Sequence, residues 1–425
     1  MAIETPEGYA AFDEASLIEH LAGDAVLRGR LGGAPASWKV SEVGDGNLNL
    51  VFIIDGPDGS VIVKQALPYV RLVGESWPLP LRRAYFEYNA LIRQAARDPG
   101  SVPEVFHFDE EQALVVMEYL SPHVILRHSL MAGKRHPDLG GVLGRFCART
   151  LFRGSDLSMK TADRKADLAL FAGNVELCDI TENLVFSDPY FAAEMNRHTP
   201  QLDPVVAELR ADIDLKIAAQ HLKAAFATNA ETMLHGDLHT GSVMVSDTET
   251  RVIDPEFATY GPMGFDVGML IANFLMAYFA QPGHAETEGS RAGYQHWILS
   301  VVEELWGEFA AEFTRLWREE RNGILYERTL FEDQGHGIGA EQARIDRLAA
   351  IWRDTLGFCG IEMHRRTLSL AHIAEYDQIA DEALRAQCEA RGLRLGRVLA
   401  VRRGTITGME EVLNLARHIN QEAIL

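Results

Sequence analysis

The pattern of apolar and polar residues along the chain changes character near residue 120. Before that point, two apolar alternating runs, residues 38–55 and 60–67, flank the tetrapeptide Gly-Pro-Asp-Gly. Alternation with a period of two around such a turn is typical of a β-hairpin or meander. Within residues 102–121, two more apolar runs flank the acidic turn Asp109–Glu111. We therefore expect four strands or more in this part of the chain.

A helix is predicted between these two pairs of strands. Prolines open the segment at residues 78–96, and Tyr85, Leu91 and Ile92 lie near one helical stripe. A short amphipathic helix is also expected around Asp13–Leu21. The order ββ–α–ββ predicts a small sheet with one helix, which forms an N-terminal lobe of residues 1–119.

From about residue 122 the periodicity is helical, so residues 120–425 are predicted to form a larger, mainly helical C-terminal lobe. One interruption, residues 232–262, contains two short apolar runs around a polar turn at residues 247–250, a further hairpin pattern. The uncharged stretch Val267–Ala280 is shorter than the roughly 20 residues that a membrane span needs, and we interpret it as a buried core helix. Several glycines in residues 322–342 predict a mobile loop.

Charge and cysteine content narrow the class of protein. The chain has 40 Lys and Arg residues against 61 Asp and Glu residues, a formal net charge of −21. No broad basic surface is expected, which argues against nucleic-acid binding. The four cysteines form no CxxC pair and the first residues do not resemble a secretory signal, so a reducing, cytoplasmic location without a membrane partner is predicted.

The segment His235–His239, HGDLH, supplies a candidate catalytic base. An aspartate fixed just before a hairpin strand can accept a proton from an attacking hydroxyl, the role that phosphoryl transfer leaves to the protein. Taken alone, the tripeptide HGD is better explained by an Asx-turn at Asp237.

A second acidic motif favours the interpretation of Asp237 as a catalytic base. Asp254 follows an apolar run 17 residues after Asp237 and opens the sequence D-P-E with Glu256. Mg²⁺ bound to ATP phosphates takes one or two carboxylates, and both side chains could face that ion. The alternative is a pair of solvated acids in a turn.

Candidate nucleotide-binding residues lie in the N-terminal lobe. The glycines of Gly44-Asp45-Gly46 between strands let backbone N–H groups approach phosphates closely, although a plain hairpin turn is the alternative. Lys64 sits in the apolar run VIVK and needs an anionic partner, which ATP phosphates supply. Glu87 on the following helix can orient this lysine, or else lies on a solvated helix face.

The segment after the fourth strand links the two predicted lobes. Backbone groups of Glu118, Tyr119 and Leu120 are candidates for hydrogen bonds to adenine.

Together these elements resemble the protein-kinase-like fold of small-molecule phosphotransferases. HGDLHTGSVMV followed by VIDPEFATYGPMGFDVG resembles more narrowly the signature of the 5-methylthioribose kinases of methionine salvage. GDGNLNLVF, LPLRRAYFEYNAL and EMHRRTLSLAHIAEY are similar to that family too, so the resemblance spans Gly44 to Tyr376. The expected fold is α+β and bilobal.

The resemblance also implies roles for residues at matching positions. Asp237 would activate the anomeric 1-hydroxyl of the sugar, and Asp254 and Glu256 would hold Mg²⁺. Arg365 and Arg366 look like the paired arginines that this family places at the substrate site, where an ordinary helix face with ion pairs is the alternative. The family further implies ATP as the phosphate donor and a homodimer.

The resemblance implies roles for further positions as well. Lys64 and the turn Asp45–Gly46–Asn47 would hold the nucleotide phosphates. Asp266 is expected to support the catalytic loop from a buried helix start. Ser242 stands where other kinases carry the catalytic-loop asparagine, and Glu256 would replace that metal ligand, a substitution that the methylthioribose kinases share.

Two other functions stay open at this point. One is a phosphotransferase of the same fold that acts on choline, an aminoglycoside or another sugar. The other is a catalytically inactive nucleotide-binding module, against which the joint retention of Lys64, Asp237, Asp254 and Glu256 speaks.

Overall fold

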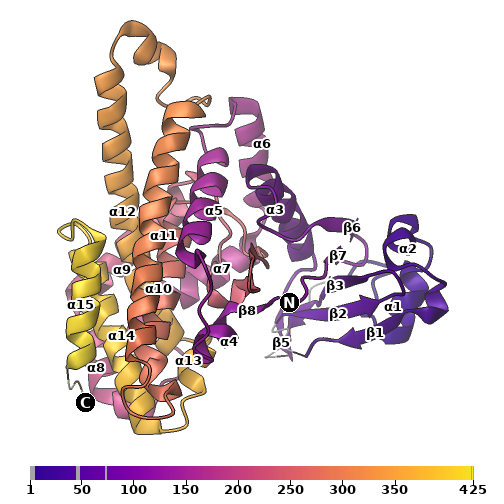
Figure 1. Ribbon diagram of the computed structural model, residues 1–425, viewed down its shortest axis with the longest axis horizontal. Helices are drawn as coiled ribbons and strands as arrows, with labels where there is room; N and C mark the ends of the chain where they lie inside the picture. The colour runs from indigo at the N-terminus through magenta and orange to yellow at the C-terminus, as the bar shows by residue number, and fades with distance from the viewer. Residues whose placement is uncertain (1–4, 45–47, 72–73, 423, 425) are drawn as a thin grey trace. The chain divides into compact units, whose positions relative to one another are not determined.

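The computed structural model describes residues 5–44, 48–71, 74–422 and 424. Within them the chain packs as two compact units (Figure 1). The first contains the residues up to 123 together with 174–177 and 251–258, and the second contains the rest. The first unit thus extends beyond the predicted boundary at residue 119 and includes the D-P-E segment, which the prediction assigned to the C-terminal lobe.

Hydrogen bonds within the first unit explain why residues 251–258 belong to it. The Val252 N–H donates to the Ser101 carbonyl at 2.8 Å. The Asn174 side-chain amide donates to the carbonyls of Glu256 and Ala258 at 2.9 and 3.0 Å. These contacts join residues far apart in sequence, so the local periodicity of residues 251–258 does not predict them.

The first unit is built on a five-stranded antiparallel sheet in the order β1-β2-β3-β7-β6. The strands are β1 (Lys39–Glu42), β2 (Asn49–Asp55), β3 (Ser60–Ala66), β6 (Val105–Asp109) and β7 (Leu114–Glu118). The Gly56 N–H donates to the Gly59 carbonyl at 2.8 Å and closes the predicted β2–β3 hairpin. A separate ribbon pairs β4 (Tyr69–Val70) with β5 (Gly74–Pro78).

Alternation along β3 gives the two faces of this sheet different roles. Val61 and Val63 belong to an apolar core that also contains leucines of α1 (Glu14–Leu21) and α2 (Ala25–Leu31). Lys64 points to the opposite face, where it meets Glu87 of α3 (Arg83–Arg97). The sheet therefore places one charged side chain against α3 while its other face is covered by α1 and α2.

The predictions for this unit are confirmed in outline, but the ribbon of β4 and β5, the helix α2 and the buried stripe of α3 were not predicted correctly. The helix α2 was not predicted, because its seven residues, AVLRGRL, are too few to show a clear period. Ile92 is 42% exposed, so the predicted stripe is displaced. The buried face of α3 runs instead through Ala84, Glu87, Leu91 and Gln94.

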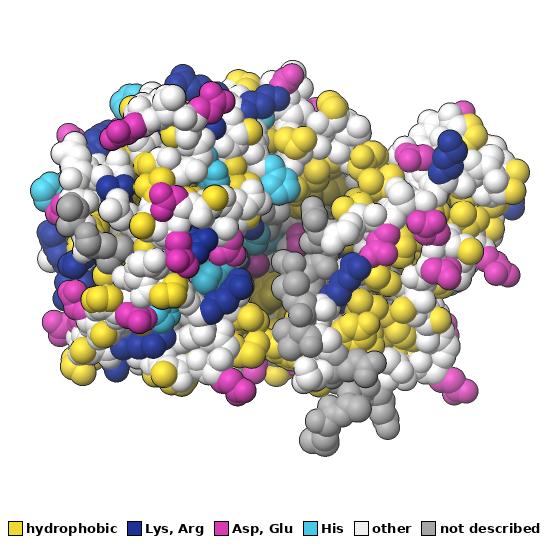
Figure 2. Space-filling model, turned by 90° about the horizontal axis from the view of Figure 1, so that it is seen from below, with side chains coloured by type: hydrophobic (Ala, Val, Ile, Leu, Met, Phe, Trp, Pro, Cys, Tyr) yellow, Lys and Arg dark blue, Asp and Glu magenta, His cyan; other side chains and the backbone are white. Residues whose placement is uncertain are grey.

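The second unit is mainly helical, as predicted. The helices of more than one turn that lie wholly within it are α4 (Leu126–Met131), α5 (Leu139–Arg153), α6 (Thr161–Phe171), α8 (Asp203–Ala211), α9 (Ile213–Thr228), α10 (Gly264–Ala280), α11 (Ala292–Glu319), α12 (Gly337–Leu368), α14 (Glu382–Arg402) and α15 (Met409–Gln421). The helix α7 (Val175–Leu184) begins in the first unit and ends in the second, and α13 (Ala374–Asp377) is a single turn. Figure 2 shows acidic and basic side chains interspersed on one face of this unit.

Helix α10 forms the centre of the second unit and is buried along its whole length, as predicted. It packs against α11, α12 and α14, which lie around it in Figure 1. Gly264 and Gly268 allow the contact with α12, since a Cβ on either would lie 2.6 Å from backbone atoms of Thr355. No helix in the described part of the chain combines the length and apolar character that a membrane span requires.

Short strands and 3₁₀ turns support the segment that contains Asp237. Strand β8 (Val124–Ile125) pairs with β10 (Val243–Val245), and β9 (Thr232–Met233) pairs with β12 (Tyr260–Gly261). The 3₁₀ turn η4 (Thr240–Ser242) joins the catalytic segment to β10, and β11 (Thr250–Val252) follows the predicted polar turn.

The expected loop at residues 322–342 is only partly a loop. It contains the 3₁₀ turns η6 (Arg328–Leu330) and η7 (Glu332–Gln334), and α12 begins within it at Gly337. The mobility of this segment stays a prediction.

Candidate active site

The predicted chemical residues gather into two clusters, one inside each unit. The base cluster, in the second unit, contains Asp237, His239, Glu362, Arg365 and Arg366. The carboxylate cluster, in the first unit, contains Lys64, Glu87, Asp254 and Glu256, with Asn49 and Arg83 beside them.

Asp266 at the start of α10 holds the loop before Asp237. Its carboxylate accepts hydrogen bonds from the N–H groups of His235 at 2.7 Å and Gly236 at 3.0 Å. Gly236 has a φ of 88°, a conformation that glycine adopts without strain. On the other side, the Ser242 hydroxyl donates to the Asp237 carbonyl at 3.0 Å. Asp266 supports this loop as expected, and the Ser242 hydroxyl also serves to hold it.

Two arginines and a histidine surround the Asp237 carboxylate. Its Oδ1 atom lies 2.8 Å from Arg366 Nη2 and 3.2 Å from Arg365 Nη1, and its Oδ2 atom lies 3.3 Å from His239 Nε2. Burial favours the protonated acid, but Arg366, His239 and Arg365 outweigh that effect and hold the pKa of Asp237 well below its usual range. Asp237 is therefore ionised at neutral pH and can accept a proton.

Glu362 supports the two arginines from inside the protein. It lies one helical turn before them on α12 and is fully buried. Its Oε1 atom accepts a hydrogen bond from Arg366 Nε at 2.5 Å and one from Asn273 of α10 at 3.3 Å, and Arg365 Nη1 lies 3.4 Å away. Asp237, Glu362 and the two arginines thus form a charge-balanced quartet, which satisfies the rule that buried charges are paired.

In the carboxylate cluster, Lys64 bridges two acids. Its ammonium group lies 2.9 Å from Glu87 Oε1 and forms a second, short contact with Asp254 Oδ1. Burial alone would lower the pKa of Lys64, but the Asp254, Glu87 and Glu256 carboxylates raise it above its ordinary value. The lysine therefore stays charged, and its predicted partner Glu87 is in contact with it.

Glu256 is held by two residues of the same unit. Its Oε2 atom accepts a hydrogen bond from Asn49 Nδ2 at 3.0 Å and lies 3.5 Å from Arg83 Nε. Arg83, which is almost fully buried, also donates to the Leu48 carbonyl and to Asn49 Oδ1, at 2.7 and 2.8 Å. These bonds fix the Glu256 carboxylate while Asp254 remains 44% exposed.

This cluster suits a divalent cation. One oxygen each from Glu87, Asp254 and Glu256 lie within 4.8 Å of one another. Carboxylate oxygens are the ligands that Mg²⁺ prefers. Burial raises the pKa of Glu87, and the nearby Asp254 and Glu256 raise it further against the opposing effect of Lys64. The carboxylates are thus crowded, which a bound cation would relieve.

Two other predicted nucleotide-binding residues, Gly44 and Glu118, lie at or just beyond the ends of strands. Gly44 lies in the turn after β1, whereas Asp45, Gly46 and Asn47 lie outside the described residues. Glu118 ends β7, and its N–H donates to the Glu104 carbonyl at 2.8 Å. Tyr119 and Leu120 follow in a segment without regular secondary structure. Their contact with adenine stays a prediction.

Four residues that contact these two clusters or belong to them were not assigned a role from the sequence: His239, Glu362, Asn49 and Arg83. All lie in the quoted motifs HGDLH, EMHRR, NLNL and LRRAYF, next to residues that were singled out. Asn49 and Arg83 reach Glu256 from β2 and α3, 207 positions away for Asn49. Position inside a motif was the only available signal, because the contacts themselves are long-range.

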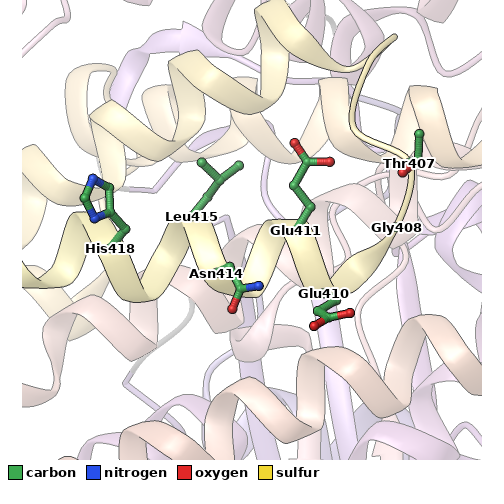
Figure 3. A pocket seen from close by; sticks show the side chains of 7 residues that line it. All are labelled: Thr407, Gly408, Glu410, Glu411, Asn414, Leu415 and His418. Carbon is green, nitrogen blue, oxygen red and sulfur yellow. The ribbon is translucent and has the colours of Figure 1, made fainter.

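A surface depression on α15 is unrelated to these clusters. Figure 3 shows its lining side chains, which come from α15 and the residues just before it: Thr407, Gly408, Glu410, Glu411, Asn414, Leu415 and His418. None of the predicted site residues lines it.

The small sheet, the helical unit and the two clusters define a phosphotransferase of the protein-kinase-like type. In agreement, residues 39–304 match the family model described as "Phosphotransferase enzyme family". The chain belongs to this family and, within it, to the methylthioribose kinases.

That narrower membership rests on similarity along nearly the whole chain. A methylthioribose kinase of Escherichia coli O45:K1 (strain S88 / ExPEC) is 44% identical over 98% of this chain and 100% of its own length. Methylthioribose kinase 1 of Oryza sativa subsp. japonica is 41% identical over 96% of this chain and 95% of its own. One from Yersinia pseudotuberculosis serotype O:1b (strain IP 31758) is 42% identical over 92% of both chains.

Solved structures of other kinases are more distantly similar. A glucosamine kinase in complex with glucosamine, ADP and inorganic phosphate has 15% identity and a TM-score of 0.46, over 90% of this chain and 86% of that chain. A choline/ethanolamine kinase family protein from Mesorhizobium loti has 15% identity and a TM-score of 0.39, over 95% and 99%. The family model over residues 39–304, together with the small antiparallel sheet and the mainly helical second unit, confirms the predicted α+β, protein-kinase-like fold class.

Proposed function

We propose that this chain is an ATP-dependent 5-methylthioribose kinase, which phosphorylates the anomeric 1-hydroxyl of its substrate in methionine salvage. The observation that carries the proposal is an ionised Asp237 held by paired arginines, in a chain that matches methylthioribose kinases over nearly its full length.

Asp237 is the catalytic base in this proposal. As the sugar hydroxyl oxygen bonds to the γ-phosphorus of ATP, the bond to the β-phosphate oxygen breaks, ADP leaves, and the hydroxyl proton passes to the carboxylate. The Oδ1 atom already faces two guanidinium groups, whereas Oδ2 faces only His239 among these three residues, so Oδ2 is the oxygen that takes the proton. A weakly basic carboxylate suffices, because a loose transition state needs positioning more than strong deprotonation.

Asp254 and Glu256 would hold Mg²⁺. Other kinases use an asparagine as a metal ligand at the position of Ser242, and Glu256 would take over its role here. Bound there, the ion would neutralise charge on the ATP phosphates. The chain's own contribution is to orient Glu256 through Asn49 and Arg83 and to keep Asp254 open to solvent. Lys64 and residues 44–47 would bind phosphate oxygens, and backbone groups of Glu118, Tyr119 and Leu120 would bind adenine.

Arg365 and Arg366 would act at the acceptor. Each guanidinium group has five N–H donors, and contacts with Asp237 and Glu362 use only part of them. Donors that remain can bind ribose hydroxyl groups next to the base. We also propose, from the family resemblance, that the enzyme is a cytoplasmic homodimer; sedimentation analysis of the purified chain can test the dimer.

The decisive experiment is an acceptor panel with ATP and Mg²⁺, with ADP release as the readout and product analysis by phosphorus NMR. We expect 5-methylthioribose to be the preferred acceptor and to receive phosphate at the anomeric oxygen. Ribose lacks the methylthio group and should be worse by about 1–3 kcal/mol in kcat/KM. Turnover of choline or ribose at the rate of methylthioribose would overturn the substrate assignment and leave the kinase assignment intact.

A further inference from the structure

His239 lies next to the base, and its hydrogen bonds define which ring nitrogen carries a proton. The Gly241 N–H donates to His239 Nδ1 at 2.8 Å, and Arg127 Nη2 lies 3.4 Å from the same nitrogen. Both groups are donors, so Nδ1 must be the acceptor and carries no proton. In a neutral imidazole the other nitrogen then bears the hydrogen, which makes Nε2 a donor.

The surroundings of the ring favour this neutral form. Burial, together with Arg366 and Arg127, lowers the pKa of His239 to about 4, although Asp237 opposes the change. Behind Arg127 of α4 lies the fully buried Glu375 of α13, whose Oε2 atom is 2.9 Å from Arg127 Nε. Glu375 also accepts a hydrogen bond from the Thr240 hydroxyl at 2.9 Å. Arg127 is thus fixed beside the histidine.

The protonated nitrogen faces the catalytic carboxylate. His239 Nε2 lies 3.3 Å from Asp237 Oδ2, the oxygen that neither Arg365 nor Arg366 contacts in the described hydrogen bonds. Without this third donor, the carboxylate could rotate about its bond to Cβ while it kept its arginine contacts at Oδ1.

We infer that His239 is a positioning residue for phosphoryl transfer, whose Nε2–H fixes the Oδ2 atom of Asp237 in the orientation that receives the acceptor's proton. The inference rests on the proposed function, since it takes Asp237 as the base. His239 acts here as a neutral donor, and Arg127 and the Gly241 N–H maintain the tautomer that makes it one.

The His239 side chain also has a structural role, which an experiment must distinguish from the positioning of Asp237. His239 is also the N-cap of the turn η4, through its bond with the Gly241 N–H. Asparagine is a good N-cap and places a polar atom near the position of Nδ1, but it is too short to reach Asp237. Glutamine extends as far as Nε2 and can donate there, but it is a poor cap.

The two replacements therefore give opposite expectations. His239→Asn should lower kcat by about 10- to 100-fold, the usual effect of losing a hydrogen bond to a charged group, with the KM for ATP unchanged. His239→Gln should keep kcat within about tenfold of the parent and lower the melting temperature. His198→Asn is the matched control: His198 pairs with Asp203 at 2.7 Å elsewhere in the same unit, and kcat should not change.

The pH profile gives a readout that a purely structural role would not move. A donor to the carboxylate favours its ionised form, so its loss in His239→Asn should shift the acid limb of kcat to higher pH. The other charged groups facing Asp237, namely Arg365, Arg366 and Asp266, remain in place. The inference is overturned if His239→Asn keeps the parent's kcat, or if Gln lowers kcat as much as Asn without a shift of the limb.

Nitrogen-15 NMR of the histidine side chains tests the hydrogen bond without any acceptor. We expect the signal missing in His239→Asn to show the Nε2–H tautomer and to change in Asp237→Asn. A Nδ1–H tautomer, or a signal insensitive to Asp237→Asn, would overturn the inference. If the parent did not phosphorylate methylthioribose, the proposed function would fail while this spectrum still decided the role of His239.

Discussion

Arg366→Met removes the guanidinium group closest to the catalytic carboxylate. Arg366 Nη2 lies 2.8 Å from Asp237 Oδ1, and only 5% of the arginine side chain is exposed. Methionine has a similar length but has no charge and no N–H donor. Arg365 and His239 remain as the other partners of Asp237, so the change removes one charge next to the base together with one proposed donor to the acceptor.

The distance and burial set the expected magnitude. An opposite charge within about 4–6 Å lowers the pKa of a carboxyl group by about 1–3 units. Loss of Arg366 should therefore raise the pKa of Asp237 by about 1–3 units, or about 1.4–4 kcal/mol in the free energy of deprotonation. Glu362, no longer neutralised by Arg366, acts in the same direction.

The sign of the effect on rate follows from the role of the base. Only ionised Asp237 accepts the hydroxyl proton, so kcat falls as the pH drops through its pKa. In the parent this pKa is well below the usual range, and the rate should persist into acid. In Arg366→Met the acid limb should move to higher pH by about 1–3 units.

The assay is kcat against pH at saturating ATP, Mg²⁺ and methylthioribose, with the melting temperature measured in parallel. Arg366→Lys keeps a charge near Asp237 without the planar fork, so its limb should move less. Arg318→Met is the matched control, since Arg318 is exposed and pairs with Glu341. A folded Arg366→Met enzyme whose acid limb superimposes on that of the parent would refute this account of Asp237.

Two further predictions concern the base and the metal. Asp237→Ala should lower kcat by about 10²–10⁴-fold with ATP affinity nearly intact, measured by turnover and by nucleotide titration; more than half of the parent's kcat would contradict it. Asp254→Asn and Glu256→Gln should each raise the Mg²⁺ concentration needed for half-maximal rate. An unchanged Mg²⁺ dependence in Glu256→Gln would show that Glu256 does not compensate for Ser242.

Local sequence was sufficient to predict the strands of the five-stranded sheet and the helices α1 and α3, but not the ribbon of β4 and β5. The alternation in β2 and β3 and the Gly56–Gly59 turn are local signals, and the structure reproduces them. The same alternation places Lys64 on the face opposite Val63, where the structure pairs it with Glu87. A short helix such as α2 carries too few residues for this kind of argument.

The contacts that shape the site were beyond such prediction because they are non-local. Motifs identified Asp237 and the two arginines separately, but no pattern predicts that Arg366 lies against Asp237 from 129 positions away. Likewise, residues 251–258 belong to the first unit through hydrogen bonds with distant residues, although the segments that flank them in sequence belong to the second. The family resemblance assigned roles to these residues, but it did not predict the contacts between them.

The charge balance of Asp237, Glu362, Arg365 and Arg366 restricts how this sequence can change. Removing one member of a buried ion pair typically costs about 3–5 kcal/mol, a large share of the roughly 5–15 kcal/mol by which proteins are stable. A lineage that replaced Glu362 alone would pass through a protein with an uncompensated arginine in its interior. Such a substitution can be kept only with a second one nearby, so these four positions should vary together among relatives or not at all.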